Sequence, residues 1–154
     1  MASSNLAIEE KELLTLLFLS NHMKGFSTNI EVATVENTNF RKVLYTGKHS
    51  QLVLMRLLPH EEIGIETHEE NDQFFRLEKG TATCVIDGTE YLLKDGDMVI
   101  VPAGAKHNII NTSNSEELKL YTLYSPPHHK DAIVRATKAE AEESAPEFDG
   151  KTTE

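Results

Sequence analysis

The sequence predicts an all-β domain, a small sandwich or barrel, with a short N-terminal extension and a polar C-terminal tail. Short apolar segments recur at intervals of about 8 to 12 residues, the spacing of antiparallel strands in such folds. Glycine, proline, asparagine and aspartate separate these segments and supply the turns. The chain has 154 residues, which suits one domain and is short for two.

Residues 1–22 precede the predicted barrel as an extension, and Ile8–Met23 contains a run of leucines after an acidic turn. Ser4 or Asn5 is suited to cap a helix there, so we expect a short packing helix or an unstructured segment. The apolar run is shorter than the roughly 18 residues of a membrane span, and no basic residues of a signal peptide precede it. Alternatively, Met23 is the natural start of the chain.

Short strands are predicted within residues 23–135, the range assigned to the barrel. They cover Gln51–Leu58, Phe74–Leu77, Thr81–Ile86, Tyr91–Leu93, Met98–Val101, Asn108–Ile110 and Leu118–Leu123. Asp87-Gly88 predicts a two-residue hairpin between two of these strands, because Asp-Gly is a favoured pair in such turns.

Residues 136–154 form the predicted tail. A brief helical patch rich in alanine and glutamate is followed by Pro146, Gly150 and polar side chains. Since this composition offers few apolar residues for burial, we expect the segment to be frayed or disordered.

Acidic residues outnumber basic ones, 25 to 15, for a formal net charge of -10. Residues 1–22 contribute -2, residues 136–154 contribute -4 and the middle another -4. A nucleic-acid-binding surface needs a basic face, and anionic membranes attract basic segments, so the charge argues against both partners. Cys84 is the single cysteine, which excludes an internal disulfide and a multi-cysteine zinc site and favours a reducing, cytoplasmic setting.

Two segments gather side chains of the kinds that bind metals. In the first, Glu66 and His68 are two residues apart, so on a strand they point to the same face. Gln73 begins a returning strand on which it shares a face with Phe75 and Leu77. In the second, His107 follows a tight turn and begins another strand.

These segments resemble the two conserved motifs of the cupin superfamily. The second motif is matched in every identity and spacing by Gly96, Pro102, Gly104, His107 and Asn111. The first keeps its spacing in Glu66, His68, Gln73 and Gly80, with His60 in place of the opening glycine. The resemblance covers roughly residues 40–128, is similar to the mannose-6-phosphate isomerase-like type, and implies a double-stranded β-helix, the jelly-roll cupin barrel.

The resemblance also implies that one divalent metal ion binds to four inward-facing side chains, Glu66, His68, Gln73 and His107. Glu66 stands where the family usually has histidine, and Gln73 where it usually has glutamate. The set therefore keeps a single negative charge, although the neutral amide predicts weaker affinity than the usual set. Mixed nitrogen and oxygen donors suit manganese, iron(II), nickel or zinc.

Further residues are candidates to line the pocket: Phe75, Arg56, Arg76 and Tyr121. In a metal-free pocket an inward Glu66 needs a cation such as Arg56 or Arg76, or a proton. Glu66 would then be an acid/base group or half of a structural ion pair.

Other candidates have simpler interpretations. Asp72 replaces Gln73 as a ligand only if the strand register slips. His128-His129 follows two prolines outside any predicted strand, so we expect it at the surface, and His60 in its acidic loop is expected to be solvated. Cys84 lies within a strand and is expected in the core.

Three functions are consistent with the resemblance. The favoured one is a metal-binding enzyme for a small polar substrate, a sugar or sugar-phosphate isomerase-like cupin, for which Glu66 is a catalytic candidate. The alternatives are a non-catalytic small-molecule-binding cupin and an iron(II)-dependent dioxygenase. Small cupins commonly dimerise, so a homodimer is expected.

Overall fold

The computed structural model describes residues 11–15 and 23–154. Residues 11–15 are helical, and the remainder of the helix expected over Ile8–Met23 lies outside the described residues, apart from Met23 itself. Within the described ranges, none of the helices is long and apolar enough to cross a membrane.

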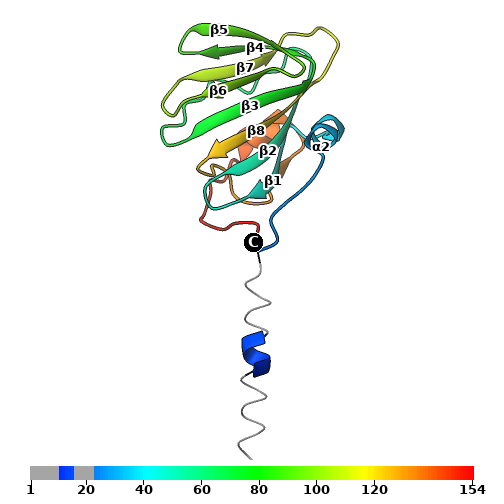
Figure 1. The fold of residues 1–154 in the computed structure, drawn as a ribbon. Helices are drawn as coiled ribbons and strands as arrows, with labels where there is room; N and C mark the ends of the chain where they lie inside the picture. The colour runs from blue at the N-terminus through cyan, green and yellow to red at the C-terminus, as the bar shows by residue number, and fades with distance from the viewer. Residues whose placement is uncertain (1–10, 16–22) are drawn as a thin grey trace, which may run out of the picture.

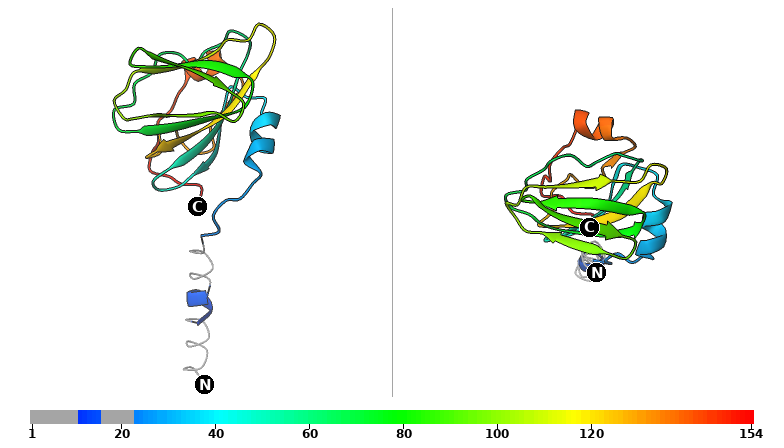
Figure 2. Two further views of the ribbon diagram at one scale, coloured as in Figure 1. Left: turned by 45° about the horizontal axis from the view of Figure 1, so that its top comes forward. Right: turned by 90° about the horizontal axis from the view of Figure 1, so that it is seen from above.

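Nine antiparallel strands form two sheets within residues 23–154 (Figure 1). The six-stranded sheet has the order β6 (Met98–Val101), β3 (Asp72–Lys79), β8 (Leu118–Ser125), β2 (Gln51–Leu57), β1 (Arg41–Thr46) and β9 (Val134–Arg135). The three-stranded sheet has the order β5 (Thr89–Lys94), β4 (Thr81–Ile86) and β7 (His107–Asn111). Two views show the sheets curving around a common interior, with α2 (Ile30–Glu36) against the outside (Figure 2). The predicted all-β jelly roll is confirmed.

Local signals account for several of these elements. β4 and β5 form the predicted hairpin, in which Asp87 and Gly88 have φ of 44° and 83°, as a type I′ turn requires. β1, β9 and α2 were not predicted. Asn29 precedes α2 as its N-cap, and its side chain accepts a hydrogen bond from the Val32 amide, as residues at this position often do.

The core lies between the sheets because inward and outward side chains alternate along each strand. On β3, Gln73, Phe75 and Leu77 are buried and point inward, as predicted. Their partners on β8 are Tyr124, Thr122 and Leu120. Cys84 is fully buried in the same core, as expected.

The expectation of a frayed C-terminal tail is wrong. α3 (Lys138–Glu143) is capped by Thr137, and Ala141 belongs to the core. Farther on, the Phe148 amide donates to the His128 carbonyl oxygen at 2.9 Å, and Thr153 and Thr46 exchange two hydrogen bonds at 2.9 and 2.8 Å. Backbone and hydroxyl groups hold this segment on the barrel, which compensates for its low apolar content.

Candidate metal centre

Glu66, His68 and His107 come together where the connection between β2 and β3 crosses β7. Backbone hydrogen bonds in both directions, each 2.9 Å, pair Glu66 with His107. His68 lies two residues farther along the connection, and its ring centroid is 5.4 Å from that of His107. One donor atom from each of the three side chains lies within 4.8 Å of the others. Two imidazoles and a carboxylate thus converge from segments about forty residues apart.

The hydrogen bonds of His107 leave a nitrogen available to a ligand. Its Nδ1 lies 3.1 Å from the Ala105 carbonyl oxygen, which can only accept, so Nδ1 carries the proton. In the neutral ring, Nε2 then has a free lone pair, and this atom is buried without a hydrogen-bond partner. A backbone carbonyl that fixes the tautomer in this way is a common support for metal-binding histidines.

Gln73 adds a second orphaned group to the interior. Its side chain is 1% exposed and lies near the Tyr124 hydroxyl, but neither Oε1 nor Nε2 makes a hydrogen bond of ordinary geometry. It pairs with Tyr124 on β8, and the Tyr124 ring lies 5.6 Å from that of His68. Because an unpaired buried amide costs about 1–3 kcal/mol, Gln73 and His107 both fit a site that is completed by a bound group.

Charges around Glu66 favour its carboxylate form. Burial by itself would raise the pKa of Glu66, but the hydrogen bond and charge of His68 and the charge of Arg41 outweigh it and lower the pKa below its ordinary value. The His68 Nε2 donates to Glu66 at 3.2 Å, and the guanidinium of Arg41 is 3.9 Å away. Burial lowers the pKa of His107, which keeps its ring neutral near pH 7. A deprotonated carboxylate at Glu66 and a neutral imidazole at His107, the forms that bind a divalent ion, are therefore available.

A cavity of about 320 Å³ opens beside His68. Its walls come from the connection between β2 and β3, the segment after β8 and the C-terminal segment: Thr67, His68, Glu69, Glu70, Asn71, Pro127, His128, Glu147 and Phe148. The volume is at the lower end of the range typical of small-molecule sites. The tail that the sequence separated from the barrel is thus part of the cavity wall.

The expectation that His128 and His129 lie at the surface is wrong. The ring of His128 is 4.3 Å from that of His68, and His129 is 4% exposed with Nε2 3.3 Å from the Tyr124 hydroxyl. Burial, together with His68, lowers the pKa of His128 to about 4, and burial with Arg41 depresses the pKa of His129 strongly. Both rings are neutral at pH 7.

The lowered pKa values of His128 and His129 predict that the metal-free protein loses stability in mild acid. Their folded pKa values lie below the unfolded value near 6.5, so the unfolded chain binds more protons as the pH falls from about 6.5 toward about 4. We expect the thermal midpoint to be about 5 °C lower at pH 5 than at pH 7.5. In His129→Gln this dependence should be weaker, and His49→Gln, at an exposed position, is the matched control. Equal slopes in wild type and His129→Gln would contradict the prediction.

Three of the proposed pocket residues lie on the outer face of the six-stranded sheet. Arg56 pairs with Glu117 at 3.4 Å, Arg76 pairs with Glu78 at 3.0 Å, and Tyr121 packs on Phe74. Strand alternation explains this correction, because each is an odd number of residues from an inward-facing neighbour. Phe75 does face inward, with its ring centroid 6.0 Å from that of His107.

Hydrogen bonds and exposure also show the roles of three other residues that the sequence singled out. Asp72 is exposed and accepts a hydrogen bond from the Ala103 amide at 2.9 Å, so the register has not slipped and Asp72 does not replace Gln73. His60 is exposed, as expected. Asn111 donates to the carbonyl oxygens of Leu57, Leu58 and Glu116, which is a structural role.

Arg41 is the charged residue near the site that the sequence reasoning missed. It lies on β1, which was not predicted, and its side chain faces the barrel interior. One signal was available: Gly47–Ser50 reads as a turn that joins the apolar strand at Gln51 to a preceding hairpin partner.

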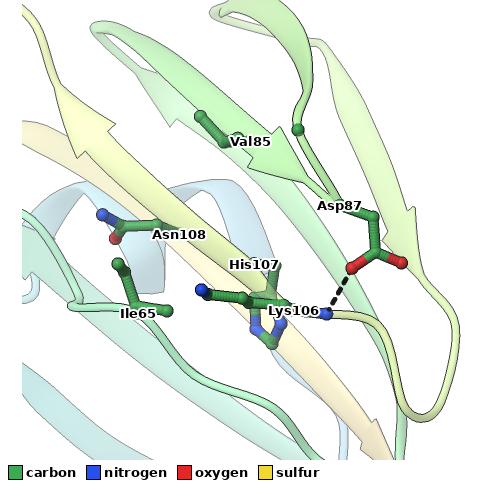
Figure 3. A pocket seen from close by; sticks show the side chains of 7 residues that line it. Ile65, Val85, Asp87, Lys106, His107 and Asn108 are labelled. Atoms are coloured by element: carbon green, nitrogen blue, oxygen red, sulfur yellow. Dashed lines mark hydrogen bonds between the residues drawn. The ribbon is translucent and has the colours of Figure 1, made fainter.

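A second hollow, of about 560 Å³, lies beside the start of β7 (Figure 3). Ile65, Val85 and Asn108 line it, and the Lys106 amide donates to Asp87 at 3.0 Å at its edge. Ile65 is 68% exposed. His107 of the candidate centre also borders this hollow, which shares no lining residue with the cavity beside His68.

Comparisons with known proteins agree with this architecture. A model of the cupin domain matches residues 53–124. Protein L612 of Acanthamoeba polyphaga mimivirus is 44% identical over 114 residues, which cover 72% of this chain and 71% of that protein. The crystal structure of BH2720 from Bacillus halodurans has a TM-score of 0.77 and 37% identity over 80% of this chain and 98% of that one. Quercetin 2,3-dioxygenase of Bacillus subtilis is more distant, at 26% identity over 80% of this chain and 36% of the enzyme.

Proposed function

The chain belongs to the cupin superfamily, and on that premise we propose that it is a metal-dependent enzyme acting on a small polar molecule. Glu66, His68 and His107 would hold one divalent transition metal ion, with Gln73 as the fourth protein ligand. The observation that carries the proposal is the buried Nε2 of His107, which lacks a partner and belongs to a converging set of two imidazoles and a carboxylate.

The residues around the centre have separate tasks in this proposal. The Ala105 carbonyl oxygen holds the His107 ring in the tautomer that presents Nε2, and Arg41 helps to keep Glu66 ionised. A bound ion of this kind would act as a Lewis acid that polarises a substrate carbonyl or hydroxyl. The mixed donors suit manganese, iron(II), nickel or zinc.

For the reaction, we propose an isomerase-like conversion of a sugar. The cavity beside His68 supports this choice because its lining is mainly polar and its volume of about 320 Å³ suits a small ligand. Glu66 would serve as a base only if it is not a metal ligand, since a carboxylate bound to the ion is less basic.

The donor set also favours a second candidate, an iron(II)-dependent dioxygenase. Two histidines and one carboxylate form the ligand set typical of non-haem iron(II) oxygenases, and a distant relative is a quercetin 2,3-dioxygenase. A non-catalytic cupin that binds a small molecule is the remaining alternative, and the replacement of the family's usual glutamate by Gln73 supports it.

Metal analysis and two activity measurements separate these candidates. We expect about one divalent ion per chain after purification without chelators, measured by mass spectrometry of the digested protein. Isomerisation of a sugar without oxygen uptake supports the favoured candidate, and oxygen uptake that requires iron supports the second. A metal content below one tenth per chain after incubation with each of the four metals would overturn the metal-dependent proposal.

We also propose that the chain forms a homodimer. Met98 and Ile100, 47% and 57% exposed, place apolar side chains on the outer face of the edge strand β6. Light scattering after size-exclusion chromatography measures the mass directly, and a value near 17.3 kDa at micromolar concentration would contradict the proposal.

A further inference from the structure

The residues that line the cavity beside His68 carry a negative charge, which affects the kind of substrate that can bind there. Three carboxylates line it: Glu69 and Glu70 come from the connection between β2 and β3, and Glu147 from the C-terminal segment. Among the described residues that line this cavity, none is lysine or arginine. His68 joins the cavity to the candidate metal centre, because it belongs both to the lining and to the converging set.

The basic residues that would bind a phosphate are directed elsewhere. Arg56, Arg76 and Lys119 are engaged on the outer face of the six-stranded sheet, where Lys119 lies 3.0 Å from Glu117 and also donates to the Asn37 carbonyl oxygen. Lys106 lines the second hollow, beside β7, and not the cavity beside His68. Arg41 is 6% exposed and faces Glu66 inside the barrel.

We propose that this cavity selects small uncharged or cationic polar molecules and excludes anions such as sugar phosphates, with Glu69, Glu70 and Glu147 as the residues that determine this specificity. The proposal rests on the proposed function and narrows its substrate class. All three glutamates are exposed to solvent around the cavity, and like charges gathered around a concave surface lower the local concentration of anions and raise that of cations. The C-terminal segment contributes one of the three charges.

A test that needs neither metal nor substrate measures this field directly. Nitroxides of matched size carrying an amine, a hydroxyl or a carboxylate are added in turn to the isotope-labelled full chain, and the enhanced relaxation of each amide proton is recorded. For each amide, the relaxation enhancement caused by the amine nitroxide is divided by that caused by the carboxylate nitroxide. We expect this ratio to be about threefold higher than the average of exposed amides at four positions that line the cavity: Thr67, Glu70, His128 and Phe148. A ratio at or below that average would overturn the proposal.

Two triple variants distinguish the effect of the cavity carboxylates from the effect of the net negative charge of the chain. Glu69→Gln/Glu70→Gln/Glu147→Gln should bring the ratio at the cavity amides to the surface average. The matched control is Glu36→Gln/Glu90→Gln/Glu116→Gln, which removes the same charge from exposed glutamates that do not line the cavity. If the control lowers the ratio as much as the cavity variant does, the proposed specificity residues are wrong.

A binding measurement distinguishes this inference from the sugar-enzyme proposal. Glucosamine, glucose and glucose 6-phosphate share one ring and differ in charge, and each is titrated calorimetrically into the manganese-loaded protein. We expect glucose 6-phosphate to bind at least about tenfold more weakly than glucosamine, and the opposite order would overturn the charge selection. If none of the three binds while the nitroxide ratio is as expected, the sugar substrate is wrong and the charge selection stands.

Discussion

Glu66→Gln is expected to lower the affinity for a divalent metal ion by more than about 100-fold, because loss of an outer-shell partner alone costs 10- to 100-fold. The substitution keeps the shape of the side chain and removes the single negative charge of the candidate ligand set. It also leaves Arg41, 6% exposed and 3.9 Å from the carboxylate, without a counter-charge inside the barrel. Competition with a metal-binding dye measures the affinity on the metal-free full chain.

Glu78→Gln is the matched control for this measurement. Glu78 is likewise paired with an arginine, at 3.0 Å from Arg76, and is 8% exposed, but its ion pair lies on the outer face of the sheet. Both variants change the net charge equally, so only a local role of Glu66 predicts different affinities. Metal binding by Glu66→Gln within threefold of wild type would show that the ion, if bound, does not depend on this carboxylate. The variant His68→Ala/His107→Ala tests the two imidazoles in the same assay.

The parts of the fold that local signals determine were predictable. The hairpin at Asp87-Gly88 was predictable because few residue pairs tolerate the two positive φ angles of its turn. The alternation of side chains along β3 likewise placed Gln73 and Phe75 on one face. The convergence of Glu66, His68 and His107 was expected through the family resemblance, and the backbone pairing of Glu66 with His107 is its physical basis. Spacing alone does not reveal that pairing.

Some residues were misplaced because strand alternation was applied incompletely, and others because their position depends on contacts between distant segments. Arg76 follows Phe75 directly, so an inward Phe75 requires an outward Arg76, and the two could not both line the pocket. Arg41 could not be assigned to Glu66 because its strand was not recognised. The burial of His128 and His129 depends on contacts with β8 and the C-terminal segment, which no local pattern encodes.

The low apolar content of residues 136–154 was a poor guide because hydrogen bonds replace hydrophobic burial in this segment. The Lys130 amide donates to the Pro146 carbonyl oxygen, and the Glu154 carboxylate accepts from the amides of Lys24 and Gly25 at 2.8 and 3.1 Å. These two amides lower the pKa of Glu154 below its ordinary value. Composition measures the apolar surface available for burial and is insensitive to contacts of this kind.

Removal of residues 145–154 is therefore expected to lower the thermal midpoint by about 5–10 °C. The deletion eliminates the hydrogen bond that the Phe148 amide donates to the His128 carbonyl oxygen and the two bonds between Thr46 and Thr153. Each such bond contributes about 1 kcal/mol net. A net loss of about 2–3 kcal/mol corresponds to this shift for a domain of this size. Circular dichroism at pH 7.5 on the metal-free protein measures it.

The contacts, rather than the length of the chain, should cause this loss. A variant in which residues 145–154 are replaced by ten glycine and serine residues keeps the length, and we expect it to melt within about 2 °C of the truncated chain, because neither can form the bonds to His128 and Thr46. Both variants also lack Glu147 and Phe148, so the amide of His128 should become more accessible to nitroxides. An unchanged midpoint in the truncated chain would mean that the barrel is stable without this segment, and the C-terminal wall of the cavity would then be dispensable for folding.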